Sequence, residues 1–276
     1  MSKRVLIIGE SCQDVFCYCD CNRLAPEAPV PVLDLSYEQK NPGMAFNVYE
    51  NVRALNHASL IYNAQRNSKC SNIECDIETN SGWEKITKTR LVDAKTNQMF
   101  FRLDSTTKFE RVELNNIKFK EYDAIIISDY DKGFLHKEDI KSIAETHNLT
   151  FLDTKKTVGG WAEKITFIKI NQFEYEKSKN TLRKDNFRNK LVKTLGSEGC
   201  EYKDKIYPVP RVEVKDLSGA GDTFLAGLVC NYLHSEDIID SIKFANQCAT
   251  EAVSQKGVVS LSKIKTFSDG KPIRIN

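Results

Sequence analysis

The sequence has few of the features that place a protein in a membrane or on a nucleic acid. The apolar run nearest the N-terminus, residues 5–8, is too short for a signal-peptide core or a membrane span. Almost no excess of one charge is present, because 40 basic and 38 acidic residues give a formal net charge of +2 and the two signs are interspersed. We therefore expect a cytoplasmic protein that binds neither membranes nor nucleic acid.

Disulfide bonds are not expected, although the chain has nine cysteines. The sequence is neither small nor loop-rich and shows no export signal, which favours reduced thiols. Cys17, Cys19 and Cys21 alternate with the period of a strand, so they are expected on one face of it. Zinc ligands usually lie two to four residues apart on a turn. We interpret these cysteines as small apolar side chains rather than as metal ligands.

Short apolar runs separated by helical lengths predict an α/β protein. Continuous β-rich runs of this kind are typical of buried parallel strands in a doubly wound sheet. The runs are residues 5–9, 124–128, 150–153, 167–170 and 190–194. A chain of 276 residues suits a single domain, here residues 1–276, flanked by helices on both faces of a mostly parallel sheet. Ligands of such sheets lie beyond the carboxyl ends of the strands.

Two segments, residues 15–37 and 85–104, do not follow the alternation of strands and helices. Both read as short alternating strands and turns, and three prolines stiffen the first. We expect them to form a small β lid. Its basic residues, Arg23, Lys88, Arg90 and Arg102, give it a positive character.

The stretch DLSGAGDTFLAG, residues 216–227, is the strongest candidate for chemistry. Apolar residues at helical spacing predict a helix that begins near Gly221 or Asp222, and a second helix from about residue 235 to 254 with Ser235 as its N-cap. Asp222 has two interpretations. It either caps the helix, or it accepts a proton from a hydroxyl that attacks a phosphoryl group held by the backbone N–H groups of the turn. The helix dipole is expected to keep such a carboxylate ionised.

Other candidate residues follow predicted strands, and each also has a purely structural interpretation. Asn171 and Glu174 lie one helical turn apart and are suited to holding Mg²⁺ through water. The turn TLGSEGC at residues 194–200 suits either a nucleotide or a β-hairpin. Asp14 and Asn47 are either ligand-binding residues or ordinary loop and surface residues.

Taken together, these motifs resemble the ribokinase family, the phosphofructokinase B type of sugar kinases, over essentially the whole chain. Within this family, residues 9–35, 88–104 and 127–135 resemble the kinases that phosphorylate D-glycero-β-D-manno-heptose 7-phosphate at O1. The run of residues 23–31, RLAPEAPVP, carries most of this resemblance. It implies an ATP- and Mg²⁺-dependent step in making nucleotide-activated heptose for surface polysaccharide. It also implies a homodimer formed through the β lid.

The resemblance also implies roles for individual residues. Asp222 is expected to be the catalytic base, and the N–H groups of Gly219, Ala220 and Gly221 are expected to form the anion hole. The implied sugar-binding residues are Asp14, Gly43 and Asn47, with Arg90 and Arg102 binding the 7-phosphate. The implied nucleotide-binding residues are Lys155, Asn171, Glu174, Thr194, Gly196, Gly199 and Asn246, with Asn171 and Glu174 organising Mg²⁺ through water.

The sequence departs from the family pattern in three places. Met44 stands where a second glycine is usual, Leu217 replaces a commoner threonine, and the region between residues 60 and 85 is short and polar. The chain has no room for a fused nucleotidyltransferase, so we expect a separate protein to perform later activation. The alternative interpretations are a kinase of another sugar or sugar phosphate, and a catalytically silent sensor of sugar phosphates or nucleotides.

Overall fold

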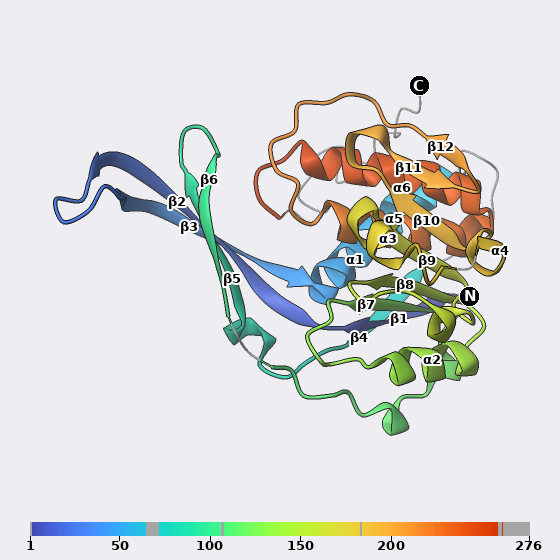
Figure 1. Ribbon diagram of the computed structural model, residues 1–276. Helices are drawn as coiled ribbons and strands as arrows, with labels where there is room; N and C mark the ends of the chain where they lie inside the picture. The colour runs from blue at the N-terminus through green and yellow to red at the C-terminus, as the bar shows by residue number, and fades with distance from the viewer. Residues whose placement is uncertain (1, 65–71, 106–107, 183, 259–260, 262–276) are drawn as a thin grey trace.

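The main body of the protein is an eight-stranded sheet with helices on both faces (Figure 1). The computed structural model describes residues 2–64, 72–105, 108–182, 184–258 and 261. The shortened region between residues 60 and 85 lies partly outside the described residues, at 65–71. The strands of the main sheet are β1 (Lys3–Gly9), β4 (Ile73–Glu78), β7 (Ala124–Asp129), β8 (Thr150–Thr154), β9 (Phe167–Asn171), β10 (Leu191–Thr194), β11 (Cys200–Tyr202) and β12 (Lys205–Tyr207).

The predicted fold class, a doubly wound and mostly parallel α/β sheet, is confirmed. The strand order is β12-β11-β10-β9-β8-β7-β1-β4. Every neighbouring pair from β4 to β10 is parallel, whereas β11 and β12 are antiparallel additions at one edge. The five strands expected from apolar runs are β1, β7, β8, β9 and β10, and their carboxyl ends lie along the same edge of the sheet (Figure 1).

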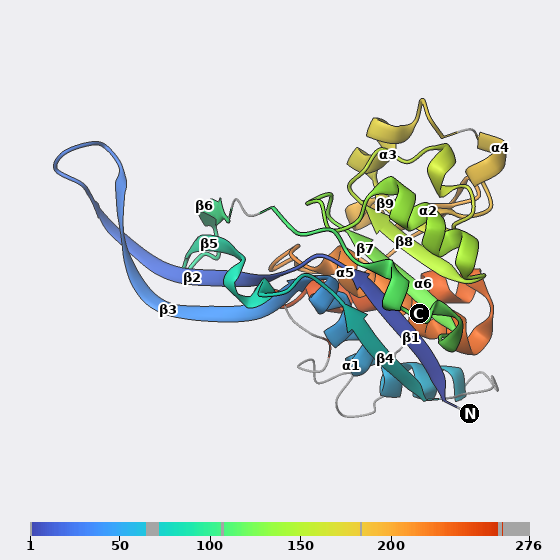
Figure 2. The ribbon, with the colours of Figure 1, turned by 90° about the horizontal axis from the view of Figure 1, so that it is seen from below.

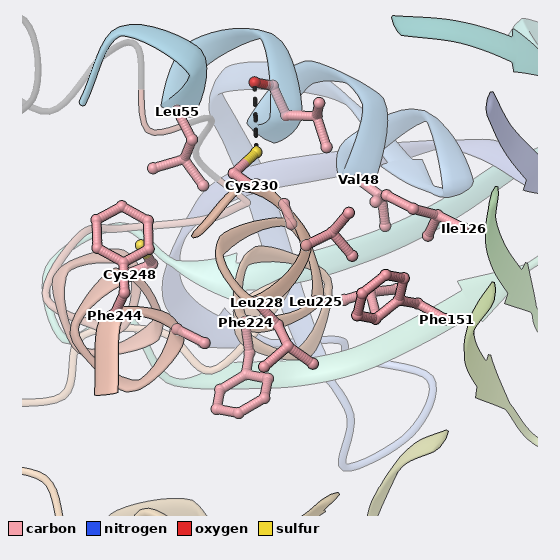
Figure 3. Close-up of a cluster of buried hydrophobic side chains, with 14 of the residues drawn as sticks. Val48, Leu55, Ile126, Phe151, Phe224, Leu225, Leu228, Cys230, Phe244 and Cys248 are labelled. Atoms are coloured by element: carbon pink, nitrogen blue, oxygen red, sulfur yellow. Dashed lines mark hydrogen bonds between the residues drawn. The ribbon is translucent and has the colours of Figure 1, made fainter. Parts of the chain in front are cut away.

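Two cores, one on each face of the sheet, explain why the strands read as unbroken apolar runs. Val5 and Ile7 point into a core shared with helices on one face, and Leu6 and Ile8 point into the core on the other. The helices of the first face are α1 (Ala45–Ala64), α5 (Ala220–Ser235) and α6 (Ile238–Val253). Those of the second face are α2 (Lys137–Thr146), α3 (Gln172–Ser178) and α4 (Lys184–Phe187). Figure 3 shows the first core, in which residues of α5 lie between α1, α6 and the sheet.

The predicted N-cap of the last helix is wrong. Ser235 ends α5, and Glu236 follows it with a left-handed backbone that reverses the chain. The N-cap of α6 is Asp237, whose Oδ1 accepts hydrogen bonds from the N–H groups of Ile239 and Asp240. Asp and Ser are both good N-caps, so the choice was decided by where the preceding helix ends.

A second sheet of four strands extends away from the main body (Figures 1 and 2). Its strands are β2 (Ser11–Leu24), β3 (Pro31–Met44), β5 (Thr87–Asp93) and β6 (Met99–Asp104), in the order β3-β2-β5-β6. We call it the lid sheet. Because β2 begins two residues after β1 ends, the lid sheet is attached to the main sheet at the edge where the carboxyl ends of the parallel strands lie. Among the described residues, no helix is long and apolar enough to cross a bilayer.

The core around α5 provides a test of the packing. Leu225 is fully buried between α1, α6 and the sheet, so Leu225→Ala should lower the free energy of unfolding by about 2–5 kcal/mol. Leu217→Ala is the matched control, because Leu217 is 69% exposed. Urea denaturation followed by circular dichroism measures both variants. Equal midpoints for the two would contradict the packing described here.

Candidate active site

The site is centred on Asp222, the third residue of α5. Asp222 is buried, and its Oδ1 accepts a hydrogen bond from the Tyr130 hydroxyl at 2.7 Å. Its Oδ2 accepts one from Asn47 Nδ2 at 3.0 Å. Gly219 is the N-cap of α5. The carboxylate is therefore held by α1 and by the segment after β7, and capping does not account for its position.

Burial raises the pKa of Asp222 above the ordinary value of an aspartate. The hydrogen bonds from Asn47 and Tyr130 oppose this rise, the nearby carboxylate of Asp153 adds to it, and Lys169 opposes it. From the sequence, the helix dipole is the only effect that can be foreseen, and it favours the ionised form. The structure adds desolvation, which acts in the other direction and is the largest effect.

The Asn47 side chain is oriented by a chain of hydrogen bonds that starts far away in the sequence. The backbone N–H of Leu261 donates to Asn51 Oδ1 at 3.1 Å, and Asn51 Nδ2 donates to Asn47 Oδ1 at 3.0 Å. Since the amide oxygen of Asn47 is already an acceptor in this chain, its NH₂ group must face Asp222. Asn47 therefore presents a donor to the carboxylate.

Glycines make room for functional side chains at three places. A Cβ atom at Gly43 would overlap Asp14 Oδ2, and one at Gly221 would lie 2.8 Å from Lys169 Nζ. At Gly219 the backbone is left-handed, with φ at 80°, and a Cβ atom would lie 2.8 Å from Asn47 Nδ2. The backbone at these positions can approach charged and amide groups only because no side chain is present.

The glycine turn presents the first N–H groups of α5 at the site. Helices leave their first N–H groups without an intrahelical acceptor, and such groups attract anions. The Thr223 N–H donates to the Gly219 carbonyl at 2.9 Å and closes the first turn. The Ala220 N–H makes a long contact, 3.4 Å, with the Leu217 carbonyl. The three predicted anion-hole residues, Gly219, Ala220 and Gly221, thus lie beside Asp222 at the start of the helix.

The predicted sugar-side residues come together where the lid sheet meets the main body. Asp14 on β2 forms a buried ion pair with Arg90 on β5. Arg90 also lies over the ring of Phe16, with its guanidinium carbon 4.9 Å from the ring centre. Asp14 and Gly43 are close because β2 and β3 pair with Cys12 opposite Gly43.

Arg102 lies opposite Arg90 in the antiparallel pairing of β5 and β6, so the two arginines share one face of the lid sheet. Arg102 is half-exposed and holds both carboxylate oxygens of Asp104, at 2.7 and 3.0 Å. Both predicted phosphate-binding arginines are therefore paired with carboxylates in this structure. An incoming anion would have to compete with Asp14 and Asp104.

On the nucleotide side, Asn171 and Glu174 form a capping box at the start of α3. Asn171 Oδ1 accepts from the Glu174 N–H at 2.9 Å, and Glu174 Oε2 accepts from the Asn171 N–H at 2.8 Å. The other oxygen, Oε1, forms an ion pair with Lys155. Lys155 Nζ also lies 3.8 Å from Asp153 Oδ1, so one ammonium group bridges two buried carboxylates.

Asp153 and Lys169 form a buried ion pair at 2.6 Å behind the glycine turn. Burial by itself would raise the pKa of Asp153, but the charges of Lys169 and Lys155 outweigh it and lower the pKa. Asp153 Oδ1 is buried without a hydrogen-bond partner. It is an acceptor available to a ligand in this cluster.

The remaining predicted nucleotide-binding residues lie around β10, β11 and α6. Thr194 ends β10, and Gly196 and Gly199 both have left-handed backbones in the turn that follows. A Cβ atom at Gly199 would overlap the Tyr207 carbonyl oxygen, and Asn246 Nδ2 donates to the same oxygen at 2.8 Å. The turn and α6 therefore meet at one carbonyl group, that of the last residue of β12.

The structure also places at the site four residues for which the sequence predicted no role there: Tyr130, Lys88, Asp153 and Lys169. Of these, Lys88 was expected only as one of the basic residues of the lid. Lys88 Nζ lies 4.6 Å from the centre of the Tyr130 ring. Asp153 lies at the end of a predicted strand, and Tyr130 comes just after another. These positions at the carboxyl ends of strands were the one sequence feature that could have indicated them. Lys169 lies inside a strand. The sequence pattern alone does not tell whether such a lysine pairs with a carboxylate of the neighbouring strand or lies at an exposed edge.

Comparison with known proteins identifies the family. Residues 67–265 match the model of the pfkB family carbohydrate kinases, and the chain belongs to this family. The predicted enzyme class, an ATP-dependent carbohydrate kinase, is thereby confirmed at the level of the family.

Similar curated proteins carry the name bifunctional protein HldE. That of Campylobacter jejuni is 29% identical over 299 residues, that of Sulfurimonas denitrificans 30% over 307 residues and that of Helicobacter pylori strain J99 29% over 313 residues. The first two alignments cover 96% of this chain and the third covers 95%. The chain spans 64–65% of the length of these relatives.

Solved structures show the same fold at low sequence identity. Ribokinase of Arabidopsis thaliana, complexed with ribose and ATP, superposes with a TM-score of 0.66 at 13% identity, over 98% of this chain and 99% of that one. Phosphofructokinase-2 of Escherichia coli superposes with a TM-score of 0.61 at 15% identity, over 98% and 99%. These similarities concern the fold.

The buried pair behind the glycine turn can be tested by stability. Lys169→Met leaves Asp153 buried without its closest cation, and we expect the free energy of unfolding to fall by roughly 3–5 kcal/mol. The double variant Lys169→Met, Asp153→Leu removes both charges and should recover much of this loss. Urea denaturation measures each variant.

Lys179→Met is the control, because its pair with Glu176 is exposed and its loss should change the midpoint little. If Lys169→Met were as stable as this control, the pair would not have the role assigned to it.

Proposed function

We propose that this protein transfers the γ-phosphoryl group of ATP to O1 of D-glycero-β-D-manno-heptose 7-phosphate, giving the 1,7-bisphosphate. The observation that carries the proposal is a buried carboxylate, Asp222, bound by Asn47 and Tyr130 at a glycine turn that opens a helix. Membership of the carbohydrate kinase family supports phosphoryl transfer. The name of the similar HldE proteins and the RLAPEAPVP run support a heptose acceptor.

In this proposal Asp222 accepts the proton of the acceptor hydroxyl as its oxygen bonds to phosphorus. Burial raises the pKa of this carboxylate, which makes it a stronger base than an exposed aspartate. The N–H groups at the start of α5 and the nearby Lys169 favour negative charge on the transferred group. Most of the acceleration comes from positioning and charge stabilisation.

The oxygen atoms around Lys155 fit a Mg²⁺ ion that is held partly through water. Asp153 Oδ1 is buried without a hydrogen-bond partner, and the Lys155 ammonium bridges Asp153 and Glu174, so the cluster already attracts a cation. Asn171 and Glu174 contribute further oxygen ligands, which Mg²⁺ prefers. When bound, the ion would neutralise charge on the nucleotide phosphates. Lys155 would then be available to the same phosphates.

We place the 7-phosphate of the acceptor on the face of the lid sheet that carries Arg90 and Arg102. This face also carries Lys88, whose cross-strand neighbour is Asp104. A phosphate gains bidentate hydrogen bonds from arginine and would exchange for the carboxylates that these arginines now hold. The acceptor ring would then lie between this face and Asp222.

A kinase of a different sugar phosphate is the second candidate, and the Met44 backbone favours it. Met44 is buried with φ at 62°, a left-handed conformation that favours glycine, beside Gly43 at the sugar side. A side chain at this position changes the shape of the acceptor region. A catalytically silent sensor is the third candidate and predicts ATP binding without turnover.

The base can be tested by Asp222→Asn. This change removes the proton acceptor while keeping the shape, and kcat should fall by about 10²–10⁴-fold with ATP binding retained. In the unchanged protein, activity should fall as the pH drops through the raised pKa of Asp222, because only the ionised form accepts a proton. Coupled detection of ADP measures both effects.

Asp237→Asn serves as the matched control, since asparagine is an equally good N-cap for α6 and the residue is remote from Asp222 in the chain. Turnover near the wild-type rate in Asp222→Asn would remove Asp222 as the base.

The acceptor is decided by a panel of sugar phosphates. The heptose 7-phosphate, the same heptose without phosphate and several hexose phosphates are each supplied with ATP and Mg²⁺, and the product is located by ³¹P NMR. Phosphate at O1 of the heptose 7-phosphate supports the proposal. Preferred turnover of a hexose phosphate would favour the second candidate, and ATP binding without turnover of any acceptor would favour the third.

We also propose that two copies of the chain associate through the lid sheet. The face opposite the arginines carries apolar side chains that the described chain leaves exposed, among them Leu35, Phe101 and Leu103. Phe101 and Leu103 alternate with Arg102 along β6 and so lie on this second face. An apolar face of this kind is typical of a protein interface.

Leu103→Lys should therefore shift the protein toward the monomer, because it places a charge in the centre of an apolar contact. Leu103 is 58% exposed in the single chain, so the change should leave the fold intact. Sedimentation velocity measures the molecular mass. Ile206→Lys, at an exposed position on β12, is the control; a dimer that survives both changes would exclude the lid face.

A further inference from the structure

Tyr130 binds the proposed base, but the proposed function does not say what this contact does. It follows β7 directly, and its hydroxyl donates to Asp222 Oδ1 at 2.7 Å. Burial raises the pKa of the phenol well above its ordinary value, and the charges of Asp222 and Asp153 raise it further. The hydroxyl therefore stays protonated and remains a donor throughout the pH range in which an aspartate titrates.

The backbone of Tyr130 is held in place by a second buried carboxylate. Glu10, just after β1, accepts hydrogen bonds from the Tyr130 N–H at 2.7 Å and from the Lys132 N–H at 3.0 Å. Asp131 between them has a left-handed backbone, with φ at 57°. The turn after β7 is thus fixed to the end of the neighbouring strand, and this holds the phenol toward Asp222.

The ring of Tyr130 touches both halves of the site. Lys88 of the lid sheet lies 4.6 Å from the ring centre, and Lys155 of the nucleotide side lies 5.3 Å from it. Cations at these distances are attracted to an aromatic ring. The side chain therefore has three contacts that hold it, and removing its hydroxyl leaves two of them in place.

We propose that Tyr130 is a positioning residue that keeps the Asp222 carboxylate ionised and oriented toward the acceptor hydroxyl. This inference rests on the proposed function, in which Asp222 is the base. Each carboxylate oxygen receives one hydrogen bond from a neutral donor, Tyr130 on Oδ1 and Asn47 on Oδ2. An oxygen of this kind can accept a second hydrogen bond, so the acceptor hydroxyl can bind without displacing the phenol.

No salt bridge forms with Asp222 among the described residues, which is why a neutral donor has a large effect on it. Lys169, whose charge lowers the pKa of Asp222, is itself bound to Asp153 at 2.6 Å. Loss of either neutral donor leaves a buried charge with one hydrogen bond fewer. The charged and titratable groups that act on Asp222 or are acted on by it are Tyr130 after β7, Asp153 on β8, Lys155 after β8, Lys169 on β9 and Cys12 on β2.

The test is Tyr130→Phe, which keeps the ring and removes the donor. The hydrogen bond favours the ionised form, so its loss raises the pKa of Asp222 further. The acid limb of kcat/KM for the heptose 7-phosphate should move to higher pH by about one unit. The rate should then be about tenfold lower on the acid side and near the wild-type rate above the limb, with the KM for ATP unchanged.

Tyr122→Phe is the matched control. Tyr122 lies just before β7, whereas Tyr130 lies just after it. Tyr122→Phe therefore removes a hydroxyl at the opposite end of the same strand. Three results would each overturn the inference. The acid limb of kcat/KM could stay in place in Tyr130→Phe, the rate of Tyr130→Phe could fall equally at every pH, or the acid limb could move by the same amount in Tyr122→Phe.

A second measurement needs no acceptor or turnover. In protein labelled with ¹³C at the aspartate carboxyl groups, the Asp222 signal is the one missing from Asp222→Asn. Its titration midpoint should be higher in Tyr130→Phe than in the wild type, and an unchanged midpoint would overturn the inference alone. Wild-type turnover in Asp222→Asn would instead overturn the proposed function, so the two failures are separable.

Discussion

The candidate site depends on how the negative charge of each buried carboxylate is stabilised at one edge of the main sheet. Charge taken out of water is unstable unless it is paired or hydrogen-bonded. Asp153 is paired with Lys169, and Glu10 accepts backbone N–H groups. Asp222 receives two neutral side-chain donors. These differences separate the pKa values: that of Asp153 is lowered, and those of Glu10 and Asp222 are raised. The carboxylate proposed as the base, Asp222, is the one of these three that is hydrogen-bonded by neutral side chains.

The buried charged side chains also need space, and glycines in the backbone leave it free. Gly43 lies against Asp14 and Gly221 lies against Lys169, each so closely that a methyl group could not be added without moving the charged side chain. Burying a charge close to the main chain gives it a fixed position without using a second side chain as a support. The glycines therefore determine where the charges lie, although they carry no functional group themselves.

The sequence predicted the sheet well because each strand is buried on both faces and its apolar run is unbroken. It also selected Asp222, which follows a recognisable glycine turn. Local patterns do not indicate a partner that is distant in the sequence. The pairing of Arg90 with Asp14 depends on the register of the lid sheet, so no local pattern shows it. The position of Tyr130 depends on Glu10, 120 residues earlier, which no local pattern reveals.

The strand β2 runs from the edge of the main sheet to the tip of the lid sheet without a break. Asp14 lies near its base, and the pairing with β3 places Gly43 beside it. The residues proposed for the nucleotide side lie instead in the main body, on or after β8, β9 and β10 and on α3 and α6. A tilt of the lid sheet about the junction at Glu10 would thus move the residues proposed to bind the acceptor together. Approach of the two substrates and closure over them would then be a single rotation.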